Sequence, residues 1–162
     1  MIYALSGLGK STLAARFPTL VLDADEFLYA AVAEAFPDEE PRVRLRAWRD
    51  LCQLPPWAVG GDDLRRWART RRAWVEPFVA AMRGGDHRLV VTSLLNPPWV
   101  VGAYYGVERG RYLEHLVVAG RPADNRHTEA MNERLAGYGP LVRLSPGEFL
   151  AERPEVLALV TG

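Results

Sequence analysis

The sequence lacks the features on which several classes of protein depend. Cys52 is its only cysteine, which excludes an internal disulfide and a metal site built from several cysteines. No apolar run approaches the roughly 20 residues that span a bilayer, and the N-terminus has neither the basic segment nor the cleavage site of a signal peptide. The formal net charge is zero, so the chain as a whole has no general attraction for polyanions. We therefore expect a cytoplasmic protein with no membrane partner.

Histidine is scarce, and lysine is scarcer. His87, His115 and His127 do not have the spacing of metal ligands, and we interpret them as ordinary residues. Lys10 is the only lysine, because every other basic residue is an arginine. Where the two residues are interchangeable, this chain has arginine. Lys10 stands where a compact ammonium group on a thin stem can enter a phosphate-binding loop.

The stretch around Lys10 reads Ala-Leu-Ser-Gly-Leu-Gly-Lys-Ser-Thr over residues 4–12. It follows an apolar run at residues 1–5 that predicts a buried strand, and it precedes a predicted helix over residues 11–17. A strand, a glycine-rich loop and Gly-Lys-Ser at a helix start are the context of a P-loop, which binds nucleotide phosphates. The predicted nucleotide-binding residues are Ser6, Gly7, Leu8, Gly9, Lys10, Ser11 and Thr12.

Each residue type in this loop has a chemical task. Gly7 and Gly9 allow backbone conformations that bring N–H groups close to phosphate oxygens, and the helix N-terminus adds donors and partial positive charge. Lys10 is predicted to reach the β- and γ-phosphates, and the Ser11 hydroxyl is predicted to ligate Mg²⁺. The pattern has Ala4 where the full motif has glycine, so an ordinary strand, turn and helix is the alternative interpretation.

The rest of the chain alternates strands with helices. Further strands are predicted at residues 19–23, 88–93, 103–107 and 140–144, and helices at residues 25–36, 42–54, 64–82, 108–119, 124–135 and after 145. This alternation indicates an α/β protein with helices on both faces of a parallel sheet. We predict a single domain over residues 1–162 with the three-layer P-loop NTPase fold and a five-stranded, mainly parallel sheet flanked by helices. A helical insertion at about 38–84 and a helical lid at about 108–136 complete the prediction.

Two aspartates end the second predicted strand, which we expect to neighbour the first. Phosphoryl transfer to a hydroxyl requires a carboxylate that accepts the proton and a ligand that holds Mg²⁺ beside Ser11. We predict Asp25 as the base and Asp23 as the metal ligand or second acid. Capping of the following helix by either residue is the alternative. The third predicted strand ends in Thr92-Ser93 without an acid, which favours a kinase over a motor or switch ATPase.

Four arginines lie on either side of a break at residues 120–122, and they are Arg109, Arg111, Arg121 and Arg126. Arginines on a mobile helical lid can close on a triphosphate and neutralise the charge of the transition state. We predict Arg121 and Arg126 in this role. A solvated helix face is the alternative interpretation of each of them.

A second basic cluster contains five arginines between residues 65 and 72, with Trp67 among them. Such a cluster can follow a nucleic-acid backbone while the indole ring stacks on a base. The alternative is a basic outer face with Trp67 buried, because Trp67 falls on the apolar stripe of the predicted helix.

The chain resembles the small P-loop kinases of the polynucleotide kinase and nucleotide kinase type. The loop at residues 6–12, followed by Val-Leu-Asp-Ala-Asp at residues 21–25, is similar to the start of polynucleotide 5′-kinases. In those enzymes the aspartate of the second strand acts as the base toward the acceptor hydroxyl. By position, the resemblance implies this role for Asp25.

The later part of the chain resembles a group of short phage-encoded P-loop kinases. The likeness lies in Val-Val-Thr-Ser at residues 90–93, Tyr-Leu-Glu at residues 112–114, Gly120, and Ser-Pro-Gly-Glu-Phe-Leu at residues 145–150. Some members of that group are taken to be 5-hydroxymethyluracil DNA kinases, which act during DNA hypermodification. The resemblance implies ATP and Mg²⁺ as cofactors, DNA as an acceptor, and the host cytoplasm as the location if the chain is phage-encoded.

Three hypotheses follow from these patterns. The first is an ATP- and Mg²⁺-dependent kinase that transfers the γ-phosphoryl group to a hydroxyl on DNA or a nucleotide, with 5-hydroxymethyluracil in phage DNA as one acceptor. The second is a (deoxy)nucleoside monophosphate kinase. The third is a non-catalytic ATP-binding module that contacts a partner through the basic cluster at residues 65–72.

Overall fold

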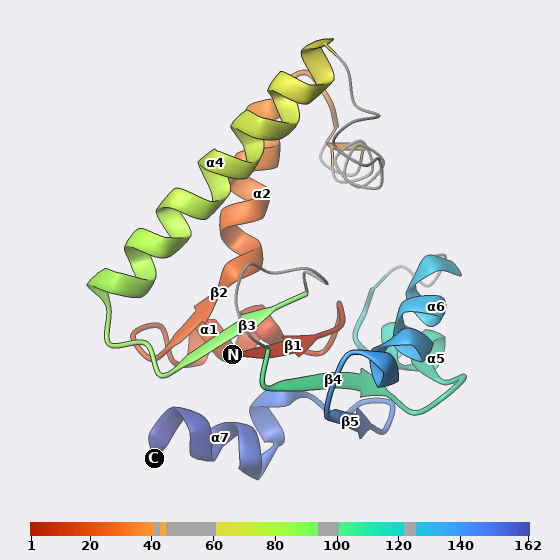
Figure 1. The fold of residues 1–162 in the computed structure, drawn as a ribbon. Coiled ribbons are helices and arrows are strands. Elements are labelled where there is room, and N and C mark those ends of the chain that lie inside the picture. Colours follow the sequence, from red (N-terminus) through yellow and green to blue (C-terminus); the bar gives the residue numbers. More distant parts are fainter. Residues whose placement is uncertain (41–42, 45–60, 94–100, 122–125) are drawn as a thin grey trace. The chain divides into compact units, whose positions relative to one another are not determined.

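The computed structural model describes residues 1–40, 43–44, 61–93, 101–121 and 126–162 (Figure 1), and only the backbone of residues 62–64, 66–67 and 126–128. The described chain divides into two compact units. The first unit comprises Met1–Asp23 and Asp86–Gly162, and the second comprises Ala24–Gly85.

The first unit is built on a five-stranded sheet in which all the strand pairs are parallel. The strands lie in the order β2-β3-β1-β4-β5. Their bounds are Ile2–Ala4 for β1, Val21–Asp23 for β2, Leu89–Thr92 for β3, Ala103–Val107 for β4 and Leu141–Leu144 for β5. The predicted α/β class and the five-stranded parallel sheet with flanking helices are confirmed.

The prediction that the second strand neighbours the first is wrong. β3 lies between β1 and β2, with Tyr3 in register with Thr92 on one side and Asp23 in register with Val91 on the other. β3 takes this interior position because it suits burial on both faces. All four of its residues are buried, as is typical of a strand in the interior of a parallel sheet. A strand can be predicted from its own residues, whereas its partner depends on where the chain returns.

Short helices connect these strands in the first unit. Their bounds are Lys10–Arg16 for α1, Tyr112–Val118 for α5, Arg126–Arg134 for α6 and Pro154–Thr161 for α7, with 3₁₀ turns at Leu135–Gly137 and Leu150–Glu152. α5 begins later than predicted, because residues 108–111 form a turn in which the Arg111 N–H donates to the Glu108 carbonyl over 3.0 Å. The terminal helix also begins later than predicted, with Pro154 at its first position, where a missing N–H costs nothing.

The core of the first unit consists of apolar side chains from the strands and from the loops around them. The most deeply buried are Ala4, Leu8, Leu13, Val91, Val107, Tyr112, Leu135, Leu144, Leu150, Val156 and Val160. Leu8 belongs to the predicted phosphate loop and Leu150 to the segment after β5. The core therefore extends directly beneath that loop.

The second unit packs α2, Ala24–Ala35, against α4, Gly61–Gly84. The rings of Phe27 and Phe78 meet edge to face with their centroids 5.8 Å apart. Trp74 and Phe78, four residues apart on α4, are buried, whereas Met82, four residues further along the helix, is exposed. The helix continues through Pro77. Most of the helix predicted at residues 42–54 lies outside the described residues.

In the described part of the chain, none of the helices combines the length and the apolar character that crossing a bilayer requires.

Candidate functional site

The carboxyl ends of the five parallel strands meet at one edge of the sheet. Residues 5–9 follow β1, Asp23 ends β2, and Ser93, Glu108 and Ser145 follow β3, β4 and β5. The strand order also changes direction at β1, because β2 and β3 lie on one side of it and β4 and β5 on the other. Open parallel sheets bind ligands at this edge, beside such a switch point. The predicted phosphate loop therefore emerges where a sheet of this topology binds ligands.

Two glycines shape the loop between β1 and α1. Gly7 has a φ of 88° and Gly9 a φ of 85°, both in the left-handed region that favours glycine. Ala4, which departs from the motif, is the last residue of β1 and is fully buried in register with Tyr105. Its φ is not positive, so a residue with a methyl side chain fits there without strain. The departure at Ala4 leaves the glycine-dependent turns intact.

Three successive carbonyl groups of the loop each accept a hydrogen bond from a distant part of the first unit. The bonds join the Tyr112 hydroxyl to the carbonyl of Ser6, Nε2 of His115 to that of Gly7 over 3.1 Å, and the N–H of Leu150 to that of Leu8 over 3.1 Å. In one peptide unit the carbonyl and the N–H point in opposite directions. The N–H groups of Gly7 and Gly9 therefore point away from these partners, and in the described structure neither donates a backbone hydrogen bond. Loop amides without a backbone acceptor are the donors that anion-binding loops use.

Lys10 folds back over the start of the loop. Its ammonium donates to the carbonyls of Ala4, over 3.0 Å, and Leu5, over 3.2 Å, and the residue is only 7% exposed. The single lysine of the chain thus has its charge inside the loop motif, with two neutral carbonyl oxygens among its partners. Its contact with a phosphate stays a prediction.

Ser11 and Asp23 form the pair that the sequence analysis assigned to Mg²⁺. The Ser11 hydroxyl donates to Oδ2 of Asp23 over 3.0 Å. The contact forms although β2 is not adjacent to β1, because α1 packs against β2. Mg²⁺ binds oxygen ligands at 2.0–2.1 Å in octahedral geometry, so two adjacent ligands lie about 2.9 Å apart. A hydroxyl and a carboxylate oxygen at 3.0 Å fit this requirement.

Asp25 belongs to the second unit and lies in the first turn of α2, where it is buried. Asp23 stands immediately before the same helix. Asp23 is therefore at the N-cap position, which is compatible with the capping alternative, although it also accepts the bond from Ser11, whereas Asp25 is the second residue of the helix. The role of Asp25 as a base stays a prediction.

The structure separates the four candidate lid arginines. Arg109 pairs with Glu133 over 2.8 Å, and Arg111 pairs with Glu108 and Glu114 over 2.6 and 2.8 Å. These two arginines are therefore occupied in local ion pairs. Arg121 is exposed, and among the described residues its side chain makes no ion pair or hydrogen bond. Arg126 begins α6, but its side chain lies outside the described part.

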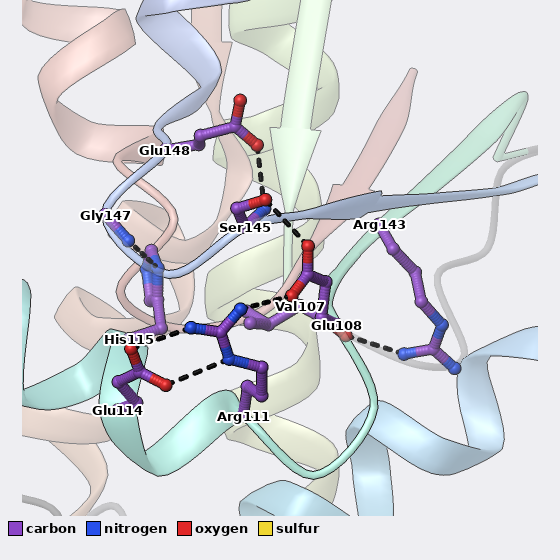
Figure 2. A network of polar contacts seen from close by, with 9 residues as sticks. All are labelled: Val107, Glu108, Arg111, Glu114, His115, Arg143, Ser145, Gly147 and Glu148. Atoms are coloured by element: carbon purple, nitrogen blue, oxygen red, sulfur yellow. Dashed lines mark hydrogen bonds and ion pairs between the residues drawn. The ribbon is translucent and has the colours of Figure 1, made fainter.

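A polar network joins the ends of β4 and β5 to α5 (Figure 2). The Ser145 hydroxyl donates to Glu108 over 2.7 Å, and Arg111 bridges Glu108 and Glu114. The bond from Ser145 and then those from Arg111 lower the pKa of Glu108 below its ordinary 4.5. The hydrogen bonds of Arg111 to Glu114 and then to Glu108 raise the pKa of Arg111. The network fastens the segment after β5 to the turn before α5.

α6 is anchored to the turn between β4 and α5 through buried groups. Oδ1 of the fully buried Asn132 accepts from the Val107 N–H over 2.9 Å, and its amide donates to Glu129 over 3.1 Å. Glu129 in turn accepts from the N–H groups of Gly110 and Tyr112 over 3.1 and 3.2 Å. This end of the predicted lid is therefore tied to the sheet. Movement of the remainder stays a prediction.

In the second unit, α4 carries a row of exposed arginines. Arg65, Arg69 and Arg72 share one helix face, because three- and four-residue steps separate them. Together with Ala68 they line an open pocket of about 470 Å³. Arg72 pairs weakly with Glu76 at 3.6 Å on the solvent side. The side chain of Trp67, predicted either to stack on a base or to be buried, lies outside the described residues.

The sequence did not reveal three buried residues whose polar groups bond to the backbone of the first unit. His115 was interpreted as ordinary and Tyr112 and Asn132 were given no role, although Tyr112 and His115 bond to the predicted phosphate loop and Asn132 bonds to Val107. One signal was present. Tyr112, His115 and Leu116 follow each other at helical spacing, which places His115 on the inner face of α5.

Comparisons of the chain with protein-family models, with curated proteins and with solved structures found no match. The function is therefore inferred from the chain's own residues.

Proposed function

We propose that this chain is an ATP- and Mg²⁺-dependent phosphotransferase that moves the γ-phosphoryl group to a hydroxyl. The observation that carries the proposal is the Ser11–Asp23 pair, 3.0 Å apart, one residue after the buried Lys10 and beside a loop with two left-handed glycines. A hydroxyl and a carboxylate for Mg²⁺ and an ammonium for phosphates are the donor set that a P-loop nucleotide site uses. They occur together at the sheet edge that binds ligands in parallel α/β proteins.

Lys10 and the loop amides bind the phosphates in this proposal. The Lys10 ammonium is bound to two neutral carbonyl oxygens in the structure. A phosphate oxygen competes well with them, because it carries negative charge and attracts the ammonium more strongly than a neutral carbonyl oxygen does. The N–H groups of Gly7 and Gly9 add donors on the same loop. Ser11 and Asp23 would hold Mg²⁺, which would neutralise charge on the phosphates.

The transfer step needs a base and charge stabilisation. Asp25 accepts the proton of the acceptor hydroxyl, whose oxygen forms a bond to the γ-phosphorus while the bond from that phosphorus to the β–γ bridging oxygen breaks. ADP leaves, and the acceptor becomes a phosphate ester. Arg121 and Arg126 are the proposed partners of the negative charge on the transferred group.

The proposed acceptor is DNA or a nucleotide, and the proposed location is the cytoplasm. The arginine row of α4 supports a nucleic acid, because three exposed guanidinium groups on one helix face suit successive phosphates. Duplex DNA that contains 5-hydroxymethyluracil is the acceptor implied by the family resemblance. Free nucleoside monophosphates are the competing acceptors.

An acceptor screen with γ-labelled ATP and Mg²⁺ tests the proposal. Single-stranded DNA with a 5′-hydroxyl, 5-hydroxymethyluracil DNA, unmodified duplex DNA and each nucleoside monophosphate are compared in parallel. Asp25→Asn is the matched control, because it keeps size and polarity and removes the base. Label on a DNA hydroxyl, lost in Asp25→Asn, supports the proposal and identifies its substrate, whereas label on the phosphate of a nucleoside monophosphate supports the competing nucleoside monophosphate kinase. Tight ATP binding without transfer to any acceptor, unchanged in Asp25→Asn, contradicts it and supports a non-catalytic ATP-binding module.

A further inference from the structure

His115 is a fully buried residue of α5 that contacts the predicted phosphate loop. It lies on the inner face of α5, and its relative exposure is 0%. Burying an imidazole without hydrogen-bond partners is costly, so both ring nitrogens require one. The two partners come from the two segments that flank the candidate site, the loop after β1 and the turn after β5.

The two contacts determine which ring nitrogen carries the hydrogen. The Gly147 N–H donates to Nδ1 over 3.2 Å, so Nδ1 carries a lone pair (Figure 2). Nε2 lies 3.1 Å from the carbonyl oxygen of Gly7, which can only accept. Nε2 therefore carries the hydrogen, and the ring is a neutral imidazole of one tautomer.

Neighbouring side chains hold the ring in this orientation. The Tyr112 ring stacks at a centroid distance of 6.4 Å and the Phe149 ring lies at 5.4 Å. A methyl group at Gly7 would lie 3.1 Å from Leu116 and 3.7 Å from His115, which shows how closely α5 approaches the loop. Phe149 also lies 3.5 Å from the place of a methyl group at Gly9. The ring is thus packed between the phosphate loop and the turn after β5.

This placement controls the conformation of the loop. Gly7 has an adaptable backbone, and rotation of the peptide unit after it would turn its carbonyl toward the side on which we propose that phosphates bind. A carbonyl oxygen there repels phosphate oxygens. Two bonds oppose this rotation, the one from Nε2 to the carbonyl and the one from the Leu8 N–H of the same peptide unit to the Leu5 carbonyl over 3.3 Å. By holding the carbonyl on the opposite side, the bond from Nε2 helps to keep the anion-binding form of the loop populated before the ligand arrives, which raises affinity.

We propose that His115 is a positioning residue, which as the Nε2–H imidazole ties Gly7 of the phosphate loop to Gly147 of the turn after β5 and so sets the affinity for ATP·Mg²⁺. The inference rests on the proposed function for its ligand. The bridge itself is a property of the protein without ligand and can be tested alone.

Two substitutions separate hydrogen bonding from packing. His115→Phe keeps an aromatic ring between Tyr112 and Phe149 and removes both hydrogen bonds. His115→Gln supplies one donor and one acceptor about as far apart as the ring nitrogens. Val160→Ala is the control for general destabilisation, because Val160 is fully buried in α7 and has no bond to the loop. Unfolding temperature and the dissociation constant of ATP·Mg²⁺ are measured for each variant.

We expect His115→Phe to weaken ATP·Mg²⁺ binding about tenfold or more, because a lost bond of this kind is worth roughly one decade in affinity. His115→Gln should bind within about threefold of the parent, and Val160→Ala should lower the unfolding temperature without changing affinity. Parent-like affinity in a folded His115→Phe overturns the proposal. If His115→Phe does not fold, His115→Asn, whose shorter amide cannot reach both partners, takes its place with the same criteria.

Imidazole ¹⁵N chemical shifts of the protein without nucleotide supply the independent test. The proposal requires the Nε2–H tautomer and slow hydrogen exchange at the Gly147 amide, with faster exchange in His115→Phe. A ring protonated on Nδ1 overturns the bridge whatever the nucleotide result. Failure of the parent protein to bind ATP·Mg²⁺, with the tautomer and exchange as expected, contradicts the proposed function and the effect on affinity but leaves the bridge supported.

Discussion

Different kinds of contact stabilise each of the two units internally. In the first unit, the backbone of the candidate site is fixed by polar groups from far along the chain, such as Tyr112 on Ser6 and Leu150 on Leu8. In the second unit, α2 and α4 pack through apolar side chains such as Phe27 and Phe78, and Arg65, Arg69 and Arg72 of α4 are exposed. On the proposed function we expect a division of work, with the phosphate and Mg²⁺ ligands in the first unit and the base Asp25 and the arginine row for the acceptor in the second.

The largest effect is expected at Lys10. Lys10→Ala removes the charge from the loop and should lower phosphoryl transfer by about 10³-fold or more, the scale of losing a charged donor at a transition state. Lys10→Arg should recover little, because the planar guanidinium does not fit where the ammonium contacts Ala4 and Leu5. Transfer rates are measured with circular dichroism as the check on folding. Parent-like rates in folded Lys10→Ala would show that the loop around Lys10 does not take part in phosphoryl transfer.

The Ser11–Asp23 pair should control the requirement for Mg²⁺. Asp23→Asn removes a charged ligand and should raise the Mg²⁺ concentration for half-maximal activity by about tenfold or more. Ser11→Thr keeps the hydroxyl and serves as the matched control for Ser11→Ala. Activity is titrated against Mg²⁺ at saturating ATP. An unchanged midpoint in Asp23→Asn would exclude this pair as the metal site.

The arginine row of α4 should act on the acceptor alone. Neutralising Arg65, Arg69 and Arg72 to Gln should weaken DNA binding and reduce the slope of log affinity against log salt by about 2 to 3, since each phosphate contact contributes about 0.9. Affinity for ATP·Mg²⁺ should not change. Arg83→Gln, an exposed arginine at the far end of the same helix, is the control. An equal change in ATP affinity would contradict the proposal that the arginine row acts on the acceptor alone.

Asn132 should contribute to stability rather than to chemistry. Asn132→Ala leaves the buried Val107 N–H without its acceptor, which should lower the free energy of unfolding by about 1–3 kcal/mol. Glu133→Ala on the same helix loses only the exposed pair with Arg109 and should cost less than about 1 kcal/mol. Urea unfolding of both variants provides the comparison. Equal losses of unfolding free energy would mean that the buried bond from Val107 to Asn132 stabilises the protein no more than the pair of Glu133 with Arg109 does.

The smallest expected effect concerns acid stability. The lowered pKa of Glu108 means that its contribution is complete above its ordinary value of 4.5 and is lost as the pH falls through the folded-state pKa. Glu108→Gln should therefore flatten the decline of stability below that pH, because it removes the carboxylate that Ser145 and Arg111 bind. Thermal unfolding between neutral and acidic pH measures the change. A decline as steep in Glu108→Gln as in the parent would assign the acid sensitivity to other carboxylates.

Local patterns predicted the features that depend on neighbouring residues. Apolar runs predicted the strands, and Gly7 and Gly9 predicted the left-handed turns that the loop contains. Contacts between distant residues were beyond reach. Nothing near β1 or β2 indicated that β3 would separate them, and nothing near Gly7 indicated that His115, 108 positions away, would bond to its carbonyl. A carbonyl has one chemical character in every residue, so its partner cannot be inferred from the sequence around it.

The most direct test of the central claim is an NMR titration of the ¹⁵N-labelled protein with ATP·Mg²⁺. If phosphates bind the loop between β1 and α1, the amide resonances of Gly7 and Gly9 shift together and saturate, while those of Gly84 and Gly162, remote in the sequence from the loop, stay in place. Shifts confined to other regions, or no saturable shift at Gly7 and Gly9, would contradict the assignment of this loop as a nucleotide site.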